Sequence, residues 1–281
     1  MRINHNMSAV FASRQLSEVG SRMDKSLERL ASGEQIVRAG DDASGLAVSE
    51  KMRTQIGGLI QAEKNAQNGL SFIQVAEGSY QQLSGILQRV RVLAVQSANG
   101  IYSAGDRVQI QAEISQLVDE VDRIGNSAEF NRMKMLRGNF ARKSKTGSMF
   151  FHVGANQNER IQVYIATVSS KAFNLVNEAN RRRTISSVAG ANAMIGYVDS
   201  GLDRLNRQRA ELGAYYNRME NTIRSITQTY ENLMAADSRI RDADMAVEIV
   251  EFTKDQILFQ TSAAMLAQAN TKPKHLLRLF E

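Results

Sequence analysis

The 281-residue chain contains no cysteine, no tryptophan and a single proline, Pro273. The absence of cysteine excludes disulfides, thiolate metal sites and cysteine nucleophiles, and leaves the compartment open. One proline is far below the average usage of about 5%, and since proline breaks helices, very long helices are permitted. We expect Pro273 to interrupt a helix only near the end of the chain. Aromatic residues make up only 6%, which favours helix-on-helix packing over a β-sandwich.

Long hydrophobic runs are also missing. The first six residues are mostly polar and no apolar segment of signal-peptide type follows them, so we expect no cleaved secretory signal. No stretch approaches the ~20 apolar residues of a membrane span, so we expect no membrane insertion. The net charge of +6 suggests an acidic neighbour and by itself says no more.

The spacing of apolar residues predicts a mainly α protein built as a long coiled-coil bundle. A first helix begins before Leu16 and is capped by Gly33, and a second runs from about residue 44 to 99. Residues 103–106 fit a capping box that starts a third helix. Residues 148–167 predict one β-hairpin. Helix resumes by about Asn192 and contains a strict four-three seam: Leu212, Tyr216, Met219, Ile223, Ile226, Tyr230 and Leu233.

The last segment, from Ile240, has apolar residues on a wide arc. One stripe is Ile240, Val247, Val250, Ile257 and Ala264, and the other is Met245, Ile249, Phe252, Phe259 and Leu266. One partner helix covers one stripe, and we expect the stripe of Met245, Phe252, Phe259 and Leu266 to remain uncovered. That patch exceeds what soluble monomers usually expose. Either the middle of the chain or other copies must cover it, and self-association is the favoured alternative.

No constellation for chemistry is present. The chain has no P-loop, nucleophile elbow, HExxH or dinucleotide fingerprint, and its three histidines lie far apart. Asp41-Asp42 and Asp242-Ala243-Asp244 are interpreted as helix caps paired with arginines rather than as metal or acid–base sites. The basic run Arg181-Arg182-Arg183 is interpreted as a solvated loop rather than a nucleic-acid patch. We therefore expect no catalytic residues, no cofactor and no metal, and no enzyme activity.

Several motifs identify a family. They are residues 3–9 (INHNMSA), 28–33 (ERLASG), 40–47 (GDDASGLA), 57–62 (GGLIQA), 208–214 (QRAELGA), 238–246 (SRIRDADMA) and 264–270 (AMLAQAN). Together they cover both ends and most of the chain, and they resemble bacterial flagellin. Residues 3–6 (INHN), 99–103 (NGIYS) and 148–156 (SMFFHVGAN) resemble the spirochaete core flagellins, whose filaments turn inside the periplasm.

The resemblance implies a layout. Residues 1–43 and 236–281 would form paired terminal helices in the inner filament core, and residues 44–235 an outer helical-bundle domain that includes the hairpin, with no large surface domains. The implied polymer interface of the inner core consists of Leu16, Val19, Met23, Leu27, Leu30, Met245, Ile249, Phe252, Phe259 and Leu266.

The resemblance also implies partners. The first is the chain itself in a helical homopolymer, together with other flagellin isoforms, and the others are flagellar sheath proteins and the export apparatus with its chaperone. Export through the flagellum would need no cleaved signal. Arg89, Leu93, Gln96 and Glu113 match flagellin positions contacted by the innate immune receptor for flagellin. The alternative for Leu93 is a place in the helix seam with Leu83, Ile86 and Val90.

The predicted function is a structural subunit that polymerises into the flagellar filament core for motility. A hook–filament junction protein is the nearest alternative, because it would share the terminal motifs but not the segment 149–156. A basic coiled-coil nucleic-acid binder is the alternative from another class and would show steeply salt-dependent DNA affinity.

Overall fold

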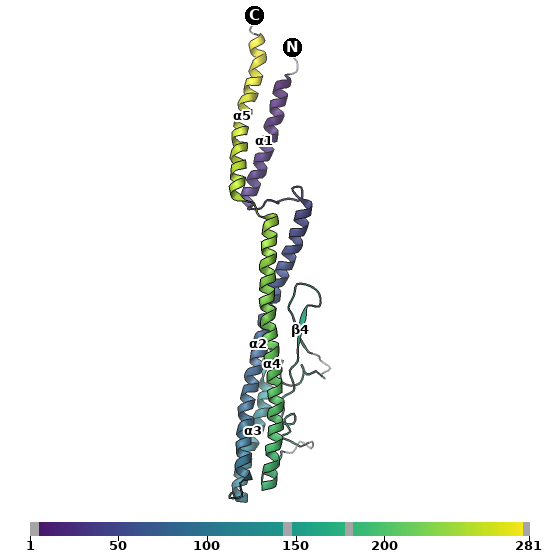
Figure 1. Ribbon diagram of the computed structural model, residues 1–281, viewed down its shortest axis with the longest axis vertical. Coiled ribbons are helices and arrows are strands. Elements are labelled where there is room, and N and C mark those ends of the chain that lie inside the picture. Colours follow the sequence, from purple (N-terminus) through teal and green to yellow (C-terminus); the bar gives the residue numbers. More distant parts are fainter. Residues whose placement is uncertain (1–5, 143–147, 178–181, 278–281) are drawn as a thin grey trace. The chain divides into compact units, whose positions relative to one another are not determined.

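The computed structural model describes residues 6–142, 148–177 and 182–277 (Figure 1). These residues form five helices and two small antiparallel sheets, so the predicted mainly α class with one clear hairpin is confirmed. The helices are α1 (Met7–Ser32), α2 (Ala43–Ala98), α3 (Ala104–Ser127), α4 (Val188–Arg241) and α5 (Met245–Leu277). The strands are β1 (Glu129–Phe130), β2 (Met133–Lys134), β3 (Met149–His152) and β4 (Arg160–Val163).

The helix ends follow the local signals. Gly33 has φ 74°, the left-handed conformation that favours glycine, and its N–H donates to the carbonyl of Arg29. The Ser103 hydroxyl accepts from the N–H of Asp106, and the Asp106 carboxylate accepts from the Ser103 backbone. Both predicted caps are confirmed. The fourth helix begins at Val188, four residues before the predicted start.

The hairpin predicted within residues 148–167 is present as β3 and β4, with Phe151 opposite Ile161. Ile165 lies beyond the strand but is fully buried, and its N–H donates to the carbonyl of Phe140 at 3.1 Å. The β1–β2 hairpin was not predicted. Its strands have two residues each, too few to show alternation, and its turn places Asn131 and Arg132 at positive φ.

Two compact units divide the chain. The terminal unit comprises residues 1–56 and 231–281, and the central unit comprises residues 57–230. The boundaries lie inside α2 and α4, because both helices continue from one unit into the other. They differ from the sequence-based boundaries at 43/44 and 235/236, and the assignment of these parts to inner and outer layers of a filament stays a prediction.

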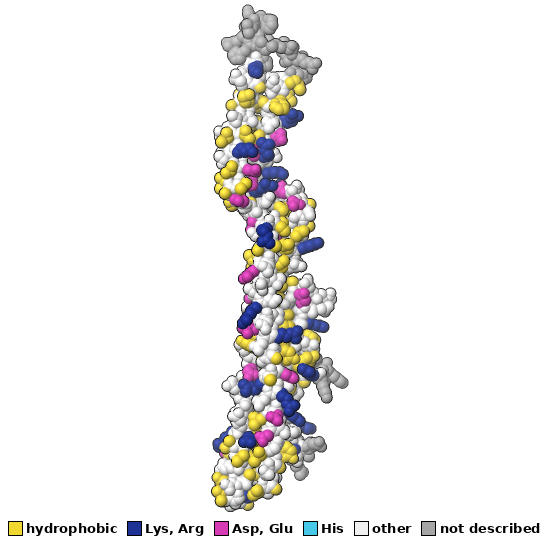
Figure 2. Space-filling view, in the orientation of Figure 1, with side chains coloured by type: hydrophobic (Ala, Val, Ile, Leu, Met, Phe, Trp, Pro, Cys, Tyr) yellow, Lys and Arg dark blue, Asp and Glu magenta, His cyan; other side chains and the backbone are white. Residues whose placement is uncertain are grey.

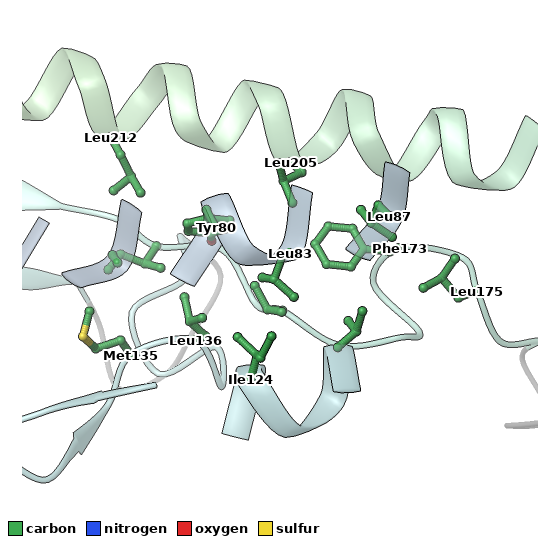
Figure 3. Close-up of a cluster of buried hydrophobic side chains, with 14 of the residues drawn as sticks. Tyr80, Leu83, Leu87, Ile124, Met135, Leu136, Phe173, Leu175, Leu205 and Leu212 are labelled. Carbon is green, nitrogen blue, oxygen red and sulfur yellow. The ribbon is translucent and has the colours of Figure 1, made fainter. Parts of the chain in front are cut away.

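The core of the central unit is a helix-on-helix seam between α2, α3 and α4. Leu205 and Leu212 of α4 point toward Tyr80 and Leu83 of α2 (Figure 3). The predicted α4 seam is confirmed in this unit, because its alternate members Leu212, Met219 and Ile226 are buried. The Tyr80 hydroxyl donates to the carbonyl of Ala166 at 3.1 Å. Burial, together with the nearby carboxylates of Glu211 and Glu77, raises the pKa of Tyr80 above its usual range.

Two expectations for the C-terminal segment are wrong. Ile240 belongs to α4, which ends at Arg241, and so it does not continue a stripe of the last helix. α5 runs through Pro273 to Leu277. Proline removes one backbone donor, and the lost hydrogen bond does not end the helix here. Within the described ranges, no helix is both long enough and apolar enough to cross a membrane.

We expect Gly125→Ala to destabilise the central unit by about 1–3 kcal/mol. An added Cβ at Gly125 would lie 2.7 Å from the carbonyl oxygen of Val168, a backbone atom that cannot rotate away. Urea unfolding followed by circular dichroism measures the change. Gly85→Ala is the matched control, because a Cβ there meets nothing within 4 Å and should be neutral or stabilise by up to about 1 kcal/mol. Equal midpoints for the two variants would contradict the prediction.

Candidate self-association surface

α1 and α5 pair side by side in the terminal unit (Figure 1). They run antiparallel, because Asn6 donates to the carbonyl of Ala269 at 2.8 Å while Arg29 reaches Glu248 at the other end of the pair. Buried and half-buried residues follow four-three spacing on both helices. On α1 these are Ala9, Ala12, Leu16, Val19, Met23, Ser26 and Leu30, and on α5 they are Glu248, Phe252, Asp255, Phe259, Ser262, Leu266 and Ala269. We call these residues the terminal seam.

Two acidic residues lie inside the terminal seam. Asp255 is 6% exposed and accepts from Arg22 at 3.4 Å, and Glu248, also 6% exposed, lies 3.8 Å from Arg29. The arginines are seven residues apart on α1, and so are the acids on α5. Both pairs therefore define the same antiparallel register.

Apolar packing alone does not define that register. Leu16, Met23 and Leu30 repeat every seven residues, as do Phe252, Phe259 and Leu266, so a seven-residue shift would still bury them. The same shift would leave one seam acid without its arginine. A buried unpaired charge is strongly unfavourable, and polar residues at seam positions set register in coiled coils. We infer that the two pairs help to select the observed alignment.

Backbone hydrogen bonds and ion pairs connect the segment after α1 to the segment before α5. The N–H of Ala243 donates to Gly33 O at 2.9 Å, and that of Gln35 donates to Arg241 O at 2.6 Å. Five side chains in this region are joined by ion pairs and hydrogen bonds, and we call them the root cluster: Glu34, Ser49, Arg53, Asp237 and Arg241.

Arg53 joins the two carboxylates of the root cluster, at 2.8 Å from Glu34 and 3.1 Å from Asp237. Arg241 lies 2.9 Å from Glu34, and the Ser49 hydroxyl donates to Asp237 at 2.6 Å. Partial burial opposes ionisation of Glu34, but hydrogen bonds from Arg53 and Arg241 outweigh it and lower its pKa. Burial likewise opposes ionisation of Asp237, and the bonds from Ser49 and Arg53 lower its pKa.

Asp42 and Asp244 act as helix caps, as expected, but the expected pairing with arginines is wrong where ion pairs are described: Asp41 pairs with Lys25, while Arg38 pairs with Glu28 and Arg241 with Glu34 and Glu50. Asp42 accepts from the N–H groups of Ser44 and Gly45 at 2.9 Å, and Asp244 accepts from that of Ala246 at 2.9 Å. Among the residues that the structure describes, no cluster of histidine and acidic side chains could hold a metal ion. His5 and the side chain of His275 lie outside those residues.

Large apolar side chains remain exposed around the terminal seam, interspersed with charged ones (Figure 2). We call them the terminal apolar surface: Met7, Val10, Phe11, Leu27, Met245, Val247, Ile249, Val250, Ile257, Leu258 and Met265. A groove of about 670 Å³ between the helices is lined by Met7, Phe11, Leu258 and Met265 among others. Soluble proteins rarely expose so many clustered apolar groups without using them for an interaction.

The expectation that the stripe with Phe252, Phe259 and Leu266 stays uncovered is wrong. Phe252, Phe259 and Leu266 face α1 in the terminal seam, and Phe259 lies over Gly20. The side left open carries Val247, Val250 and Ile257. Both stripes are apolar in sequence, so the apolar pattern alone does not choose between them. The seam acids face the arginines of α1 and so lie on the same side of α5 as Phe252 and Phe259.

The ten predicted interface residues therefore divide into two groups. Leu27, Met245 and Ile249 are exposed, whereas the others lie in the terminal seam of a single chain. Exposed Leu27 lies beside the terminal seam, because Ser26 occupies the seam position on this turn of α1. The residues that sequence reasoning missed are Ser26, Glu248 and Asp255. Continuing the four-three spacing from Phe252 and Phe259 would have found both acids.

The four candidate receptor contacts lie in the central unit. Arg89 and Glu113 are exposed and form an ion pair of 2.7 Å, and exposed Gln96 donates to the Tyr102 hydroxyl at 3.1 Å. Leu93 is only 2% exposed and packs in the core with Leu83 and Val90. The folded unit does not offer Leu93 for contact, which confirms its place in the helix seam.

The two described residues of the basic run, Arg182 and Arg183, have interaction partners within the chain. Arg182 pairs with Asp119, and the Arg183 guanidinium stacks 3.5 Å from the ring centroid of Tyr197. Arg181 lies outside the described residues. Two arginines with partners of their own are less available to phosphates.

The chain resembles known proteins along its whole length. Residues 3–141 match the family of the bacterial flagellin N-terminal helical region, and residues 195–280 match the C-terminal helical region. Flagellin FlaB1 of Treponema pallidum (strain Nichols) is 53% identical over 285 residues, covering 100% of both chains. A flagellar filament 31.3 kDa core protein of Treponema maltophilum is 53% identical over 287 residues, again with 100% coverage of both.

A solved structure shares the fold. It is a putative flagellar hook-associated protein from Vibrio parahaemolyticus, with a TM-score of 0.58 and 12% identity, covering 72% of this chain and 100% of that one. At this identity the likeness concerns the fold alone.

The arginine–acid pairs of the terminal seam can be tested by charge reversal. We expect Arg22→Asp to weaken the α1–α5 pairing by about 1–2 kcal/mol, less than for a fully buried pair because Arg22 is half exposed. Hydrogen exchange of the α1 and α5 amides measures the loss. Adding Asp255→Arg to the same chain should restore much of the protection. Glu251→Arg, which reverses the charge of an exposed acid of α5, is the control for a change of charge alone. A double variant whose amides are no better protected than those of Arg22→Asp would contradict the pairing of Arg22 with Asp255.

The root cluster predicts acid sensitivity. Glu34 and Asp237 have lower pKa values when folded than when unfolded, so in the acid range the unfolded chain binds more protons. The stability that they contribute is fully present above their ordinary pKa values. It should be lost as the pH falls below about 4. Hydrogen exchange at residues 33–36 against pH measures it, and Glu34→Gln/Asp237→Asn should flatten the profile. Asp24→Asn, at an acid outside the root cluster, is the control and should leave the pH profile unchanged. A double variant with the same pH dependence as the unmodified protein would refute the prediction.

Proposed function

Because the chain belongs to the bacterial flagellin family, we propose that it is a structural subunit that polymerises into the core of the flagellar filament and serves motility. Relatives that match it over their full length at 53% identity are a flagellin and a filament core protein of Treponema species. The observation that carries the proposal is the terminal apolar surface, which a single chain leaves open.

The distribution of that surface favours packing with several neighbours rather than one. Val250 and Ile257 lie seven residues apart, on the side of α5 away from the terminal seam, and are 67% and 59% exposed. Met7 and Phe11 of α1 border the groove, at 69% and 60% exposed. A subunit enclosed by others buries apolar groups on more than one side. A helical polymer provides such an environment.

In this proposal residues 1–43 and 236–281 form the inner core of the filament and residues 44–235 its outer layer. Of the ten predicted interface residues, exposed Leu27, Met245 and Ile249 contact neighbouring subunits directly. The seven seam residues act indirectly, because they hold α1 and α5 together so that the terminal apolar surface is presented. No catalytic role is proposed for any residue.

A hook–filament junction protein is the second candidate, favoured by the fold shared with the hook-associated protein. That likeness has 12% identity, whereas flagellin FlaB1 of Treponema pallidum is 53% identical over the full chain. The filament role is therefore the better supported. A nucleic-acid role has no comparable support, since Arg182 and Arg183 have partners within the chain.

The proposal extends to place and partners. The filament is of the periplasmic, spirochaete type, reached through the flagellar export apparatus with its chaperone and without a cleaved signal. Other flagellin isoforms copolymerise with the chain, and sheath proteins coat the filament. Exposed Arg89, Gln96 and Glu113 are the proposed contacts for the innate immune receptor. Family membership and the similarity to the Treponema proteins support these assignments.

Assembly can be tested at Ile257, which is exposed in the single chain. We expect Ile257→Asp to abolish filaments in negative-stain electron microscopy, because a carboxylate would be buried between subunits without a partner. The folded monomer should be unaffected, with unchanged circular dichroism and urea midpoint. Gln256→Asp adds the same charge one residue away at an exposed polar position and should still assemble.

Normal filaments from Ile257→Asp would overturn the role of the terminal apolar surface. Loss of filaments in both variants would assign the defect to charge on α5 rather than to its apolar side, and would also count against the proposal.

A further inference from the structure

The sequence contains two Asn-Gly dipeptides, Asn68-Gly69 and Asn99-Gly100. Asparagine before glycine is the arrangement in which a side-chain amide is most easily attacked by the next backbone nitrogen, because glycine has no side chain to hinder the approach. The structure places the two dipeptides in very different surroundings.

Asn99-Gly100 lies just past the last residue of α2, Ala98, in the exposed turn before α3. The Asn99 side chain forms part of this turn, since its Oδ1 accepts a hydrogen bond from the N–H of Ile101 at 3.3 Å. Among the hydrogen bonds of the described residues, none has the Gly100 N–H as donor. The nitrogen that would attack is therefore free, and both residues are open to water.

Asn68-Gly69 lies inside α2. The helical pattern commits the Gly69 N–H to the carbonyl oxygen four residues earlier. A Cβ at this glycine would lie 2.7 Å from Met219 and 3.2 Å from Phe151, so the backbone is closely packed. Attack on the Asn68 amide would first require this part of the helix to open.

We propose that Asn99 is a site of spontaneous covalent modification, deamidation through a succinimide, and that Asn68 is protected by the fold. The Gly100 nitrogen loses its proton and attacks Asn99 Cγ, the new N–C bond forms, and the C–N bond of the side chain breaks to release ammonia. Water then opens the ring at either carbonyl. One product has aspartate at this position and the other an isoaspartyl linkage, in which the backbone passes through the former side chain.

The turn that contains Asn99 has a structural role. Arg107, only 9% exposed, donates to the carbonyl oxygens of Ser97 at 2.9 Å and Asn99 at 3.1 Å. These bonds satisfy carbonyls at the end of α2, where helical partners run out. In the isoaspartyl product the backbone gains one methylene at residue 99, and the carbonyl that Arg107 binds becomes a free carboxylate outside the main chain. Deamidation at this position therefore changes the backbone of the α2–α3 turn and adds one negative charge beside exposed Ile101.

The experiment follows both sites in one full-length sample. The purified protein is incubated at neutral pH in heavy-oxygen water and then digested with trypsin, which separates the two sites because Arg89 and Arg91 lie between them. Mass spectrometry counts label incorporated at each asparagine, and methylation by protein isoaspartyl methyltransferase reports the isoaspartyl product. We expect deamidation at Asn99 to be on the order of a hundredfold faster than at Asn68, since the helix site reacts only when it opens.

Two controls make the result specific. In urea both sites are unfolded, and their rates should become similar. Gly100→Ala should slow reaction at Asn99 without disturbing the turn, because Gly100 does not have a positive φ and a Cβ there meets nothing within 4 Å. Gly78→Ala, equally unhindered on α2, should leave the Asn99 rate unchanged. Equal rates at the two asparagines in the folded protein, or an unaltered Asn99 rate in Gly100→Ala, would overturn the proposal.

Discussion

The terminal unit depends on one constraint: α5 is apolar on more than one side, and α1 covers one of them. The terminal seam buries Phe252, Phe259 and Leu266 against α1, while Val250 and Ile257 remain open. Isolated helices gain most of their stability from packing, so the open side can be satisfied by other subunits. Family membership and the exposed apolar surface thus point to the same role.

The side of α5 that α1 covers is also the side that carries its two buried acids. Asp255 and Glu248 are buried opposite Arg22 and Arg29, and losing either pairing would leave a carboxylate unpaired in the seam. The root cluster adds a second charged connection, where Arg53 and Arg241 hold Glu34. An alignment that these pairs help to select presents the terminal apolar surface in a single arrangement.

The central unit has a different character. Its helices and the β3–β4 hairpin enclose a core in which Tyr80, Leu83 and Leu205 are almost fully buried. The close approach of Val168 to Gly125 shows that the chain is tightly packed at this point. The α2–α3 turn is the place where the same unit exposes reactive backbone, at Asn99. A fold can thus protect one Asn-Gly dipeptide and leave another open.

Much of the molecule could be derived from sequence, because helix caps and apolar spacing are local signals. The Gly33 cap, the Ser103–Asp106 capping box, the long α2 helix and the hairpin near Phe151 follow from neighbouring residues. The motifs at both ends of the chain are likewise sufficient to identify the flagellin family. What the sequence could not decide was which stripe of α5 faces α1, since both stripes were apolar. On the side that faces α1, Glu248 and Asp255 meet the arginines of a helix more than two hundred residues away. For Leu93 the sequence left two alternatives, a receptor contact or a place in the helix seam, and the packing of the central unit decided for the seam.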